Sequence, residues 1–153
     1  MNNPVSPPER FMQGAAVPGW DGGTLRWPVR VYYHHTDAGG VVYHGTYLDF
    51  MEAARIELLA ALGLDLAELA AQEAVLFIVY RLEAHYHRPA RLNEHLVVTA
   101  KIARVGGVRL EFEQRVLRGD ELLVAAKVKA ACVHPQTYKP VPLPARLREK
   151  LER

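Results

Sequence analysis

The sequence predicts an α+β fold in which a curved antiparallel sheet wraps around one long central helix. One helix-length amphipathic segment lies at residues 46–63, one strand-like segment precedes it, and four long strand-like segments follow it. A single helix has one apolar stripe to bury, and an antiparallel sheet has one apolar face to cover. The economical packing is therefore a sheet closed around the helix.

The first two elements are a strand and the helix. The run "WPVRVYYH", which begins at Trp27, is rich in β-branched and aromatic residues and predicts a strand. In "TYLDFMEAARIELLAALG" we expect Thr46 as the N-cap and Gly63 as the stop signal. A second short helix is expected in "DLAELAAQE". The long helix is indicated by apolar residues at helical spacing, namely Tyr47, Phe50, Met51, Ala54, Leu58, Ala61 and Leu62.

The rest of the chain predicts four strands and a short helix. The strands are expected at residues 74–90, 94–105, 107–119 and 121–134, and the glycine turns at 106–107 and 119–120 favour antiparallel hairpins. A Pro-rich connection and a short basic helix at about residues 144–153 complete the chain. Alternation in the third of these strands predicts one buried face, formed by Val108, Leu110, Phe112 and Val116.

Length and composition favour one domain. The chain has 153 residues, and we expect a flexible Pro/Gly-rich leader at residues 1–26 followed by a single domain at 27–153. The net charge of +2 and the absence of a Lys/Arg block argue against nucleic acid. The one cysteine, Cys132, allows no intrachain disulfide and sits in an apolar strand, where it is expected to act as a small buried hydrophobe.

The chain also lacks a membrane or export signal at the sequence level. No apolar run approaches the roughly 18 residues of a membrane helix, so no membrane insertion is expected. The N-terminus has no basic region followed by an apolar block, as a signal peptide would have. A cytoplasmic location is the resulting expectation.

The stretch "YYHHTDAGGVVYHGTYL" (residues 32–48) carries the candidate chemistry. Asp37 is either a turn residue that accepts nearby backbone N–H groups or a carboxylate aimed at a substrate. In the second reading, free N–H groups at the helix N-terminus polarise a carbonyl while the carboxylate attacks it or activates water. His44 is either a surface histidine or a donor that orients the acyl group or Asp37.

A metal site is the competing interpretation of this stretch. His34, His35, Asp37 and His44 are possible ligands, and His85 and His87 lie two residues apart. However, adjacent histidines on a strand point in opposite directions, and no HExxH or paired-cysteine spacing is present. The spacing therefore favours no metal.

The segment "VRVYYHHTDAGGVVYHGTYLDFMEAARIELL" resembles the 4-hydroxybenzoyl-CoA thioesterase family of hotdog-fold proteins, and within it the Tol-Pal-associated acyl-CoA thioesterase branch. The resemblance covers about residues 28–145. It implies a hotdog fold and hydrolysis of a small or medium acyl-CoA, or of an aryl-CoA, with helix backbone N–H as the oxyanion site and no cofactor beyond the coenzyme A of the substrate. The signature D-x-x-G-x-V-x-x-H is formed by Asp37, Gly40, Val42 and His44, followed by Tyr47.

The resemblance also assigns roles and partners. Asp37 is the implied nucleophile or general base, and His44 is the second implied catalytic residue. Implied partners are the acyl-CoA substrate, with acyl carrier protein as a further candidate, and a homodimer that assembles into a homotetramer with the site at a subunit interface. The implied substrate-binding residues are Gly39, Gly40, Gly45 and Tyr47, together with Arg88, Arg104 and Arg109 for the coenzyme A phosphates.

One departure and two alternatives remain open at this point. Relatives usually carry acidic residues before the Thr-Asp pair, where this chain has His34 and His35, which puts the substrate in doubt more than the reaction. A hotdog hydratase or dehydratase would use a helix glutamate, such as Glu52 or Glu57. A non-catalytic protein that binds acyl-CoA or acyl carrier protein is the third interpretation.

Overall fold

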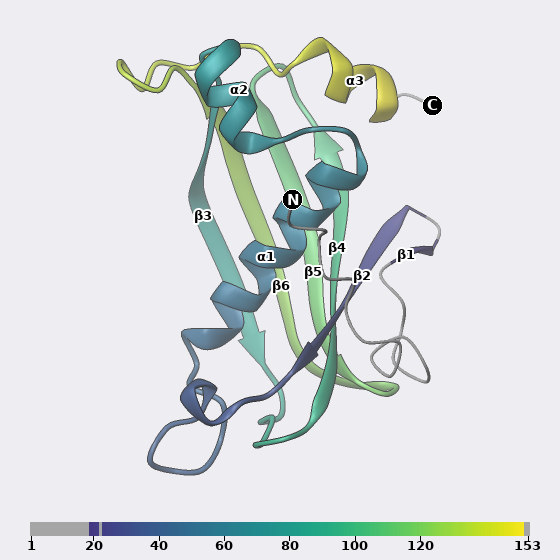
Figure 1. Ribbon diagram of the computed structural model, residues 1–153. Helices are drawn as coiled ribbons and strands as arrows, with labels where there is room; N and C mark the ends of the chain where they lie inside the picture. Colours follow the sequence, from purple (N-terminus) through teal and green to yellow (C-terminus); the bar gives the residue numbers. More distant parts are fainter. Residues whose placement is uncertain (1–18, 22, 152–153) are drawn as a thin grey trace, which may run out of the picture.

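The computed structural model describes residues 19–21 and 23–151, and it confirms the predicted α+β architecture. A six-stranded antiparallel sheet in the order β1-β2-β4-β5-β6-β3 carries helix α1 across one face (Figure 1). The strands are β1 (Gly19–Asp21), β2 (Thr24–Arg30), β3 (Leu76–Tyr86), β4 (His95–Val105), β5 (Arg109–Arg118) and β6 (Glu121–Val133). The helices are α1 (Thr46–Ala61), α2 (Leu66–Gln72) and α3 (Ala145–Leu151), with a 3₁₀ turn at Tyr33–His35.

Helix α1 forms where the apolar spacing predicts it, but its N-cap is not Thr46. Gly45 occupies the N-cap position and has no side chain with which to cap the helix, and the Thr46 N–H donates to the Tyr43 carbonyl. The C-terminal end is as expected: Gly63 adopts φ +81°, which a residue with a side chain rarely tolerates, and closes the last turn. The helix buries Tyr47, Phe50, Met51, Ala54, Leu58 and Leu59 against the sheet.

The central strands follow the predicted alternation. The hairpins β4–β5 and β5–β6 are both antiparallel, and Cys132 is buried in β6, where desolvation raises the pKa of its thiol to about 12. Strand β3 lies at one edge of the sheet and has a bulge between Val79 and Arg81. The predicted C-terminal helix is present as α3, which buries Leu147.

The sheet extends into the segment that the sequence predicts as a leader. Strand β2 begins at Thr24 rather than Trp27, and β1 pairs with it, Gly19 opposite Arg26. The reason is apolar burial: Leu25 continues the inward alternation of the strand and is buried, so residues before Trp27 have a place in the core. Residues 1–18 and 22 lie outside the described part of the chain.

A buried polar pair ties α1 to the middle of the sheet. The Arg55 guanidinium donates from Nη1 to Gln114 Oε1 at 2.8 Å, and Gln114 Nε2 donates to the Met51 carbonyl at 2.9 Å. Gln114 is only 1% exposed, and burial lowers the pKa of Arg55. Buried polar groups destabilise a fold unless they are hydrogen-bonded, so each of these side chains depends on the other.

Gln114→Ala should lower the free energy of unfolding by about 3 kcal/mol, because it leaves a buried guanidinium without its acceptor. Urea denaturation of the wild type and the variant measures this loss. Gln136→Ala, at an exposed loop position, is the matched control. A loss at position 114 no larger than that of the control would contradict the proposed coupling.

Candidate active site

The candidate site lies at the end of the sheet where β2 ends and the chain continues into α1. The chain between β3 and β4, residues 87–94, must cross this end, because β3 and β4 are separated by β5 and β6 in the sheet. We call residues 87–94 the crossing segment. Its central residue, Ala90, accepts the Val42 N–H at 2.9 Å and donates its own N–H to the Tyr47 hydroxyl at 2.9 Å. The crossing segment therefore holds both the Asp37 turn and the first turn of α1.

Asp37 sits in a tight, exposed turn. Its N–H donates to the Val41 carbonyl at 2.9 Å, and its Oδ1 accepts the Gly39 N–H at 2.8 Å. Gly40 closes the turn at φ +78°, a conformation that favours glycine. The turn bond occupies one carboxylate oxygen, and in the described part of the chain the other oxygen of Asp37 has no protein partner. The two roles expected for Asp37, a turn residue that accepts a backbone N–H and a carboxylate aimed at a substrate, are thus compatible.

The first turn of α1 offers a free backbone donor. The Thr46 N–H donates to the Tyr43 carbonyl at 2.9 Å, and the Leu48 N–H donates to the Gly45 carbonyl at 3.0 Å. Among the described residues, nothing accepts the N–H of Tyr47 between them. Such an N–H carries the partial positive charge of the helix N-terminus, where an anionic oxygen is stabilised.

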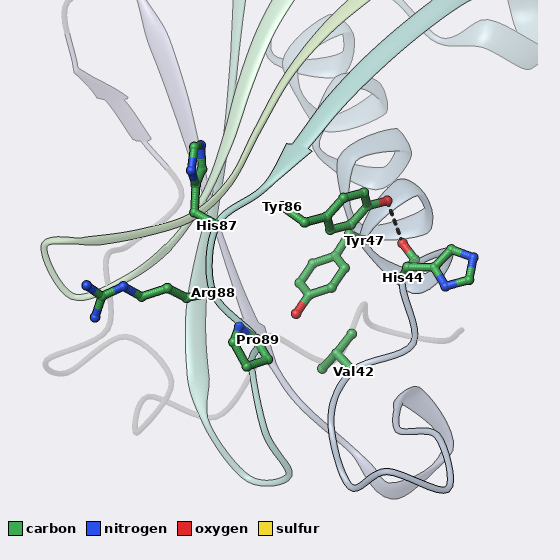
Figure 2. Close-up of a pocket in the computed structure, with 7 residues that line it drawn as sticks. All are labelled: Val42, His44, Tyr47, Tyr86, His87, Arg88 and Pro89. Carbon is green, nitrogen blue, oxygen red and sulfur yellow. Dashed lines mark hydrogen bonds between the residues drawn. The ribbon is translucent and has the colours of Figure 1, made fainter.

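A pocket of about 270 Å³ opens beside this turn. Figure 2 shows the His44 ring pointing away from Tyr47 and Val42, while the His44 carbonyl faces Tyr86. The Tyr86 hydroxyl donates to that carbonyl at 2.9 Å, and the ring of His44 packs on Tyr43. The lining consists of Val42, His44, Tyr47, Tyr86, His87, Arg88 and Pro89.

Tyr86 is a site residue that the sequence reasoning missed. Its ring packs edge-on against Tyr47 with 5.7 Å between the ring centroids, and burial raises the pKa of both phenols. Both tyrosines therefore stay protonated at neutral pH, which lets Tyr86 donate. In the sequence, Tyr86 is marked only by its position on the same face of the strand as Leu82 and Ala84. The flanking His85 and His87 are the more obvious candidates for a site.

His35 has a structural role in the segment that precedes Asp37. Its Nδ1 accepts the Tyr32 N–H at 2.9 Å and so closes the 3₁₀ turn, and its ring packs edge-on against Phe50. Burial, reinforced by the neighbouring His34, lowers the pKa of His35. His34 is exposed, with its ring 4.0 Å from that of His35. His35 thus shapes the turn that leads to Asp37.

The three predicted phosphate-binding arginines do not lie together. Arg88 lines the pocket rim and pairs with Glu121 at 2.7 Å. Arg104 and Arg109 flank the β4–β5 turn, at the opposite end of the sheet from α1's N-terminus (Figure 1). Arg104 is nine residues along β4 from His95, roughly 30 Å at about 3.3 Å per residue. Within one chain, only Arg88 is near the candidate site.

The described residues contain neither a metal-binding cluster nor a membrane-spanning helix. In residues 19–21 and 23–151, no three His, Cys, Asp or Glu side chains are grouped so that they could hold a metal ion. Strand β3 ends at Tyr86, so His87 follows the strand and lines the pocket while His85 faces another groove with Glu83. In the same residues, no helix combines the length and apolar character needed to cross a bilayer.

The fold and the strand-to-helix site define the class of protein. The family model described as the thioesterase superfamily matches residues 39–125, more than half of the chain, and the chain belongs to this family. The match begins two residues after Asp37. Acyl-CoA thioester hydrolase YbgC of Escherichia coli O6:H1 is 44% identical over 121 residues, covering 78% of this chain and 90% of that protein. Acyl-CoA thioesterase YbgC of Haemophilus influenzae is 42% identical, with 80% and 90% covered.

Solved structures agree with the hotdog architecture. A probable thioesterase from Bartonella henselae superposes with a TM-score of 0.75 at 38% identity, covering 78% of this chain and 98% of that one. A 1,4-dihydroxy-2-naphthoyl-CoA thioesterase from Synechocystis has a TM-score of 0.77 at 23% identity, which speaks for the fold alone. The expected hotdog fold is therefore confirmed.

The lowered pKa of His35 predicts a pH dependence of stability. The neutral ring accepts the Tyr32 N–H, so its contribution is complete above the unfolded-state pKa of about 6.5 and is lost as the pH falls through the lower folded-state pKa. The Tm of the wild type should therefore fall more between about pH 7.5 and 5 than that of His35→Gln.

His95→Gln, at an exposed position on β4, is the control for this comparison and should keep the wild-type dependence. Parallel Tm curves for the wild type and His35→Gln would contradict the role of the neutral ring.

Proposed function

We propose that this protein hydrolyses the thioester of a small or medium acyl-CoA, or of an aryl-CoA, to the free acid and coenzyme A. The observation that carries the proposal is the shared anchor at Ala90. A single residue of the crossing segment, Ala90, holds the Asp37 turn through its carbonyl and Val42, and the first helical turn through its N–H and Tyr47. A carboxylate and a free helix N–H are thereby kept at one end of the sheet. Membership of the thioesterase superfamily and the printed names of the YbgC relatives support the same reaction.

The chemistry follows from these two groups. The thioester carbonyl oxygen accepts the Tyr47 N–H, which stabilises the negative charge that develops on that oxygen during attack. The Asp37 carboxylate either attacks the carbonyl carbon or removes a proton from the attacking water. On the direct route, attack by Asp37 expels the coenzyme A thiolate and leaves a mixed anhydride, which water then hydrolyses to the acid and the free carboxylate. On the general-base route, water attacks the carbonyl carbon, the carbon–sulfur bond breaks, and water supplies the second oxygen of the acid. In both routes the thiolate is then protonated. Label in Asp37 after a single turnover in H₂¹⁸O would establish direct attack, because it arises only when water opens the anhydride at the aspartyl carbon.

The pocket beside Tyr47 suits the thioester arm of the substrate. Val42, Tyr47 and Tyr86 give it an apolar wall, and Arg88 at its rim supplies a cation for a phosphate. Gly39, Gly40 and Gly45 leave the approach free of side chains. Arg104 and Arg109 meet the same substrate only if another subunit supplies them. His44 would act through its carbonyl, which Tyr86 holds, and through its exposed ring.

We further propose a homodimer that assembles into a homotetramer and works in the cytoplasm. Among the described strands, β3 pairs only with β6 and leaves its outer edge open. Val79 on β3 and Ile56 on α1 are 42% and 43% exposed. An open strand edge beside apolar side chains is suited to pairing with a second copy. Acyl carrier protein remains a candidate donor of the acyl group.

Asp37→Asn should lower the rate of coenzyme A release by about three orders of magnitude, because the amide is neither a nucleophile nor a base. A panel of short, long, aromatic and enoyl acyl-CoAs, followed by thiol detection, measures the rate. Asp120→Asn, in the exposed β5–β6 turn, is the matched control and should be unaffected.

Full activity in Asp37→Asn would remove Asp37 from the mechanism. Hydration of the enoyl-CoA without hydrolysis would favour a hydratase. Binding of acyl-CoA without any turnover by the wild type would favour the non-catalytic alternative.

Tyr86→Phe should reduce kcat by about tenfold with little change in KM, because the His44 carbonyl, two peptide units before the Tyr47 N–H, loses its anchor. Steady-state kinetics on the best substrate of the panel tests this. Tyr138→Phe, whose phenol is 61% exposed on another loop, is the control. A kcat for Tyr86→Phe equal to the wild-type value would show that the hydrogen bond is dispensable.

A further inference from the structure

A cluster of charged side chains contacts the crossing segment. Arg118, at the end of β5, is at its centre. Its Nη1 donates to both carboxylate oxygens of Glu94 at 2.8 Å, and its Nε donates to Glu121 Oε1 at 2.9 Å. The second oxygen of Glu121 accepts from Arg88 at 2.7 Å. One guanidinium therefore joins the β5–β6 hairpin to the end of the crossing segment and, through Glu121, to the pocket rim.

Arg118 also contacts the backbone of the crossing segment. Its Nη1 donates to the Pro89 carbonyl at 3.2 Å, directly before Ala90. Glu94, which Arg118 holds, accepts the Arg91 N–H at 2.5 Å, directly after Ala90. The peptide units on both sides of Ala90 are thus tied to Arg118, one directly and one through a carboxylate.

Ala90 transmits this placement to the candidate site. It is fully buried, and its two backbone groups bind the Tyr47 hydroxyl and the Val42 N–H. Arg91 adds a bridge to Val41. Between Arg118 and the candidate site there is only this short run of backbone, and a shift of it would move the Asp37 turn and the first turn of α1 relative to each other.

We propose that Arg118 is a positioning residue for the thioesterase site, acting through the crossing segment to fix the distance between the Asp37 carboxylate and the free Tyr47 N–H. The inference rests on the proposed function for its catalytic consequence, although the contacts that carry it do not. Arg118 is not among the residues that line the pocket and reaches it only through the Pro89 carbonyl and the Glu121–Arg88 pair, so it is a positioning residue and not a catalytic one.

The geometry suits positioning better than general stabilisation. The Arg118 and Glu121 side chains are 30% and 32% exposed, so solvent screens part of their ion pair and weakens its contribution to stability. The fork of a guanidinium instead offers several donors in fixed directions, which the Glu94 carboxylate, Glu121 and the Pro89 carbonyl all use. The hydrogen bond from Arg118 lowers the pKa of Glu121, and the reciprocal bond raises the pKa of Arg118. Both partners therefore stay charged around neutral pH.

The first experiment compares kinetics of Arg118→Met, Arg118→Lys and Glu94→Gln on the best substrate of the acyl-CoA panel. We expect Arg118→Met to lower kcat by about tenfold with KM changed less than about twofold, since misplacement harms the transition state more than substrate binding. Arg118→Lys should recover little, because one ammonium cannot reach three acceptors. The double variant Arg118→Met/Glu94→Gln should have a kcat no lower than that of Arg118→Met alone, because both substitutions break the same contact.

Arg146→Met is the matched control, because it removes a different arginine–glutamate pair, the one that joins α3 to Glu73 at the end of α2 at 3.3 Å. It should leave kcat unchanged. A kcat for Arg118→Met within twofold of the wild type, or a loss equal to that of Arg146→Met, would overturn the proposal, and so would full recovery by lysine.

The second experiment needs no activity. Amide hydrogen exchange of the wild type and of Arg118→Met should show about tenfold faster exchange at Val42 and Ala90, whose N–H groups bond across the crossing segment, and no change at Val128 in the buried centre of β6. Glu94→Gln gives the same test if Arg118→Met does not fold.

Unchanged exchange at Val42 and Ala90, or an equal rise at Val128, would overturn the positioning role. The two experiments also separate the two proposals. If the wild type hydrolyses no acyl-CoA, the proposed function fails, whereas local exchange still decides whether Arg118 holds the crossing segment.

Discussion

The burial of helix α1 against the sheet is the interaction on which the rest of the molecule depends. Its apolar stripe contributes six buried side chains, and the larger ones such as Met51 and Leu58 are each worth roughly 2 kcal/mol relative to exposure. The Arg55–Gln114 pair then fixes the position of the helix along its axis, because sliding the helix would separate the buried guanidinium from its acceptor. A helix held in this way has a fixed N-terminus, and the free N–H of Tyr47 has a fixed place.

The strand order produces the second half of the site. Because β3 lies at the sheet edge and β4 lies beyond β5 and β6, the chain must cross the end of the sheet where α1 begins. A crossing chain would leave backbone groups unpaired, and these groups find partners in Val42, Tyr47 and Arg118. The same bonds that satisfy the crossing segment therefore organise the candidate site. The groups that satisfy the backbone of the crossing segment are thus the same groups that position the candidate site.

Part of the candidate site could be predicted from the sequence. Asp37 and the helix start are neighbours along the chain, so a local motif and the helical period were sufficient to bring them together. The partners of these groups are 40 or more residues away, as Ala90 is from Tyr47 and Tyr86 from His44, and no spacing rule links them. The two histidines before Thr36 looked like ligands, but His35 accepts a backbone N–H and packs on Phe50. Arg88 lies near the candidate site, whereas Arg104 and Arg109 lie far from it. The sequence could not show this difference, because it depends on where the strands end.

The sequence by itself determined the elements and the architecture, because the periods of 3.6 and 2 record which face of each element is buried. It misplaced the start of β2, because Leu25 is drawn into the core by a tertiary contact that no local pattern encodes. It also misplaced the N-cap of α1, because a turn closed by the Tyr43 carbonyl and the Thr46 N–H leads directly into the helix. Tertiary structure alone decided the strand order, the crossing segment, and the contacts of Tyr86, Ala90 and Arg118. The physical reason is that hydrogen bonds between distant segments depend on the three-dimensional path of the chain, whereas amphipathic periodicity is a local property.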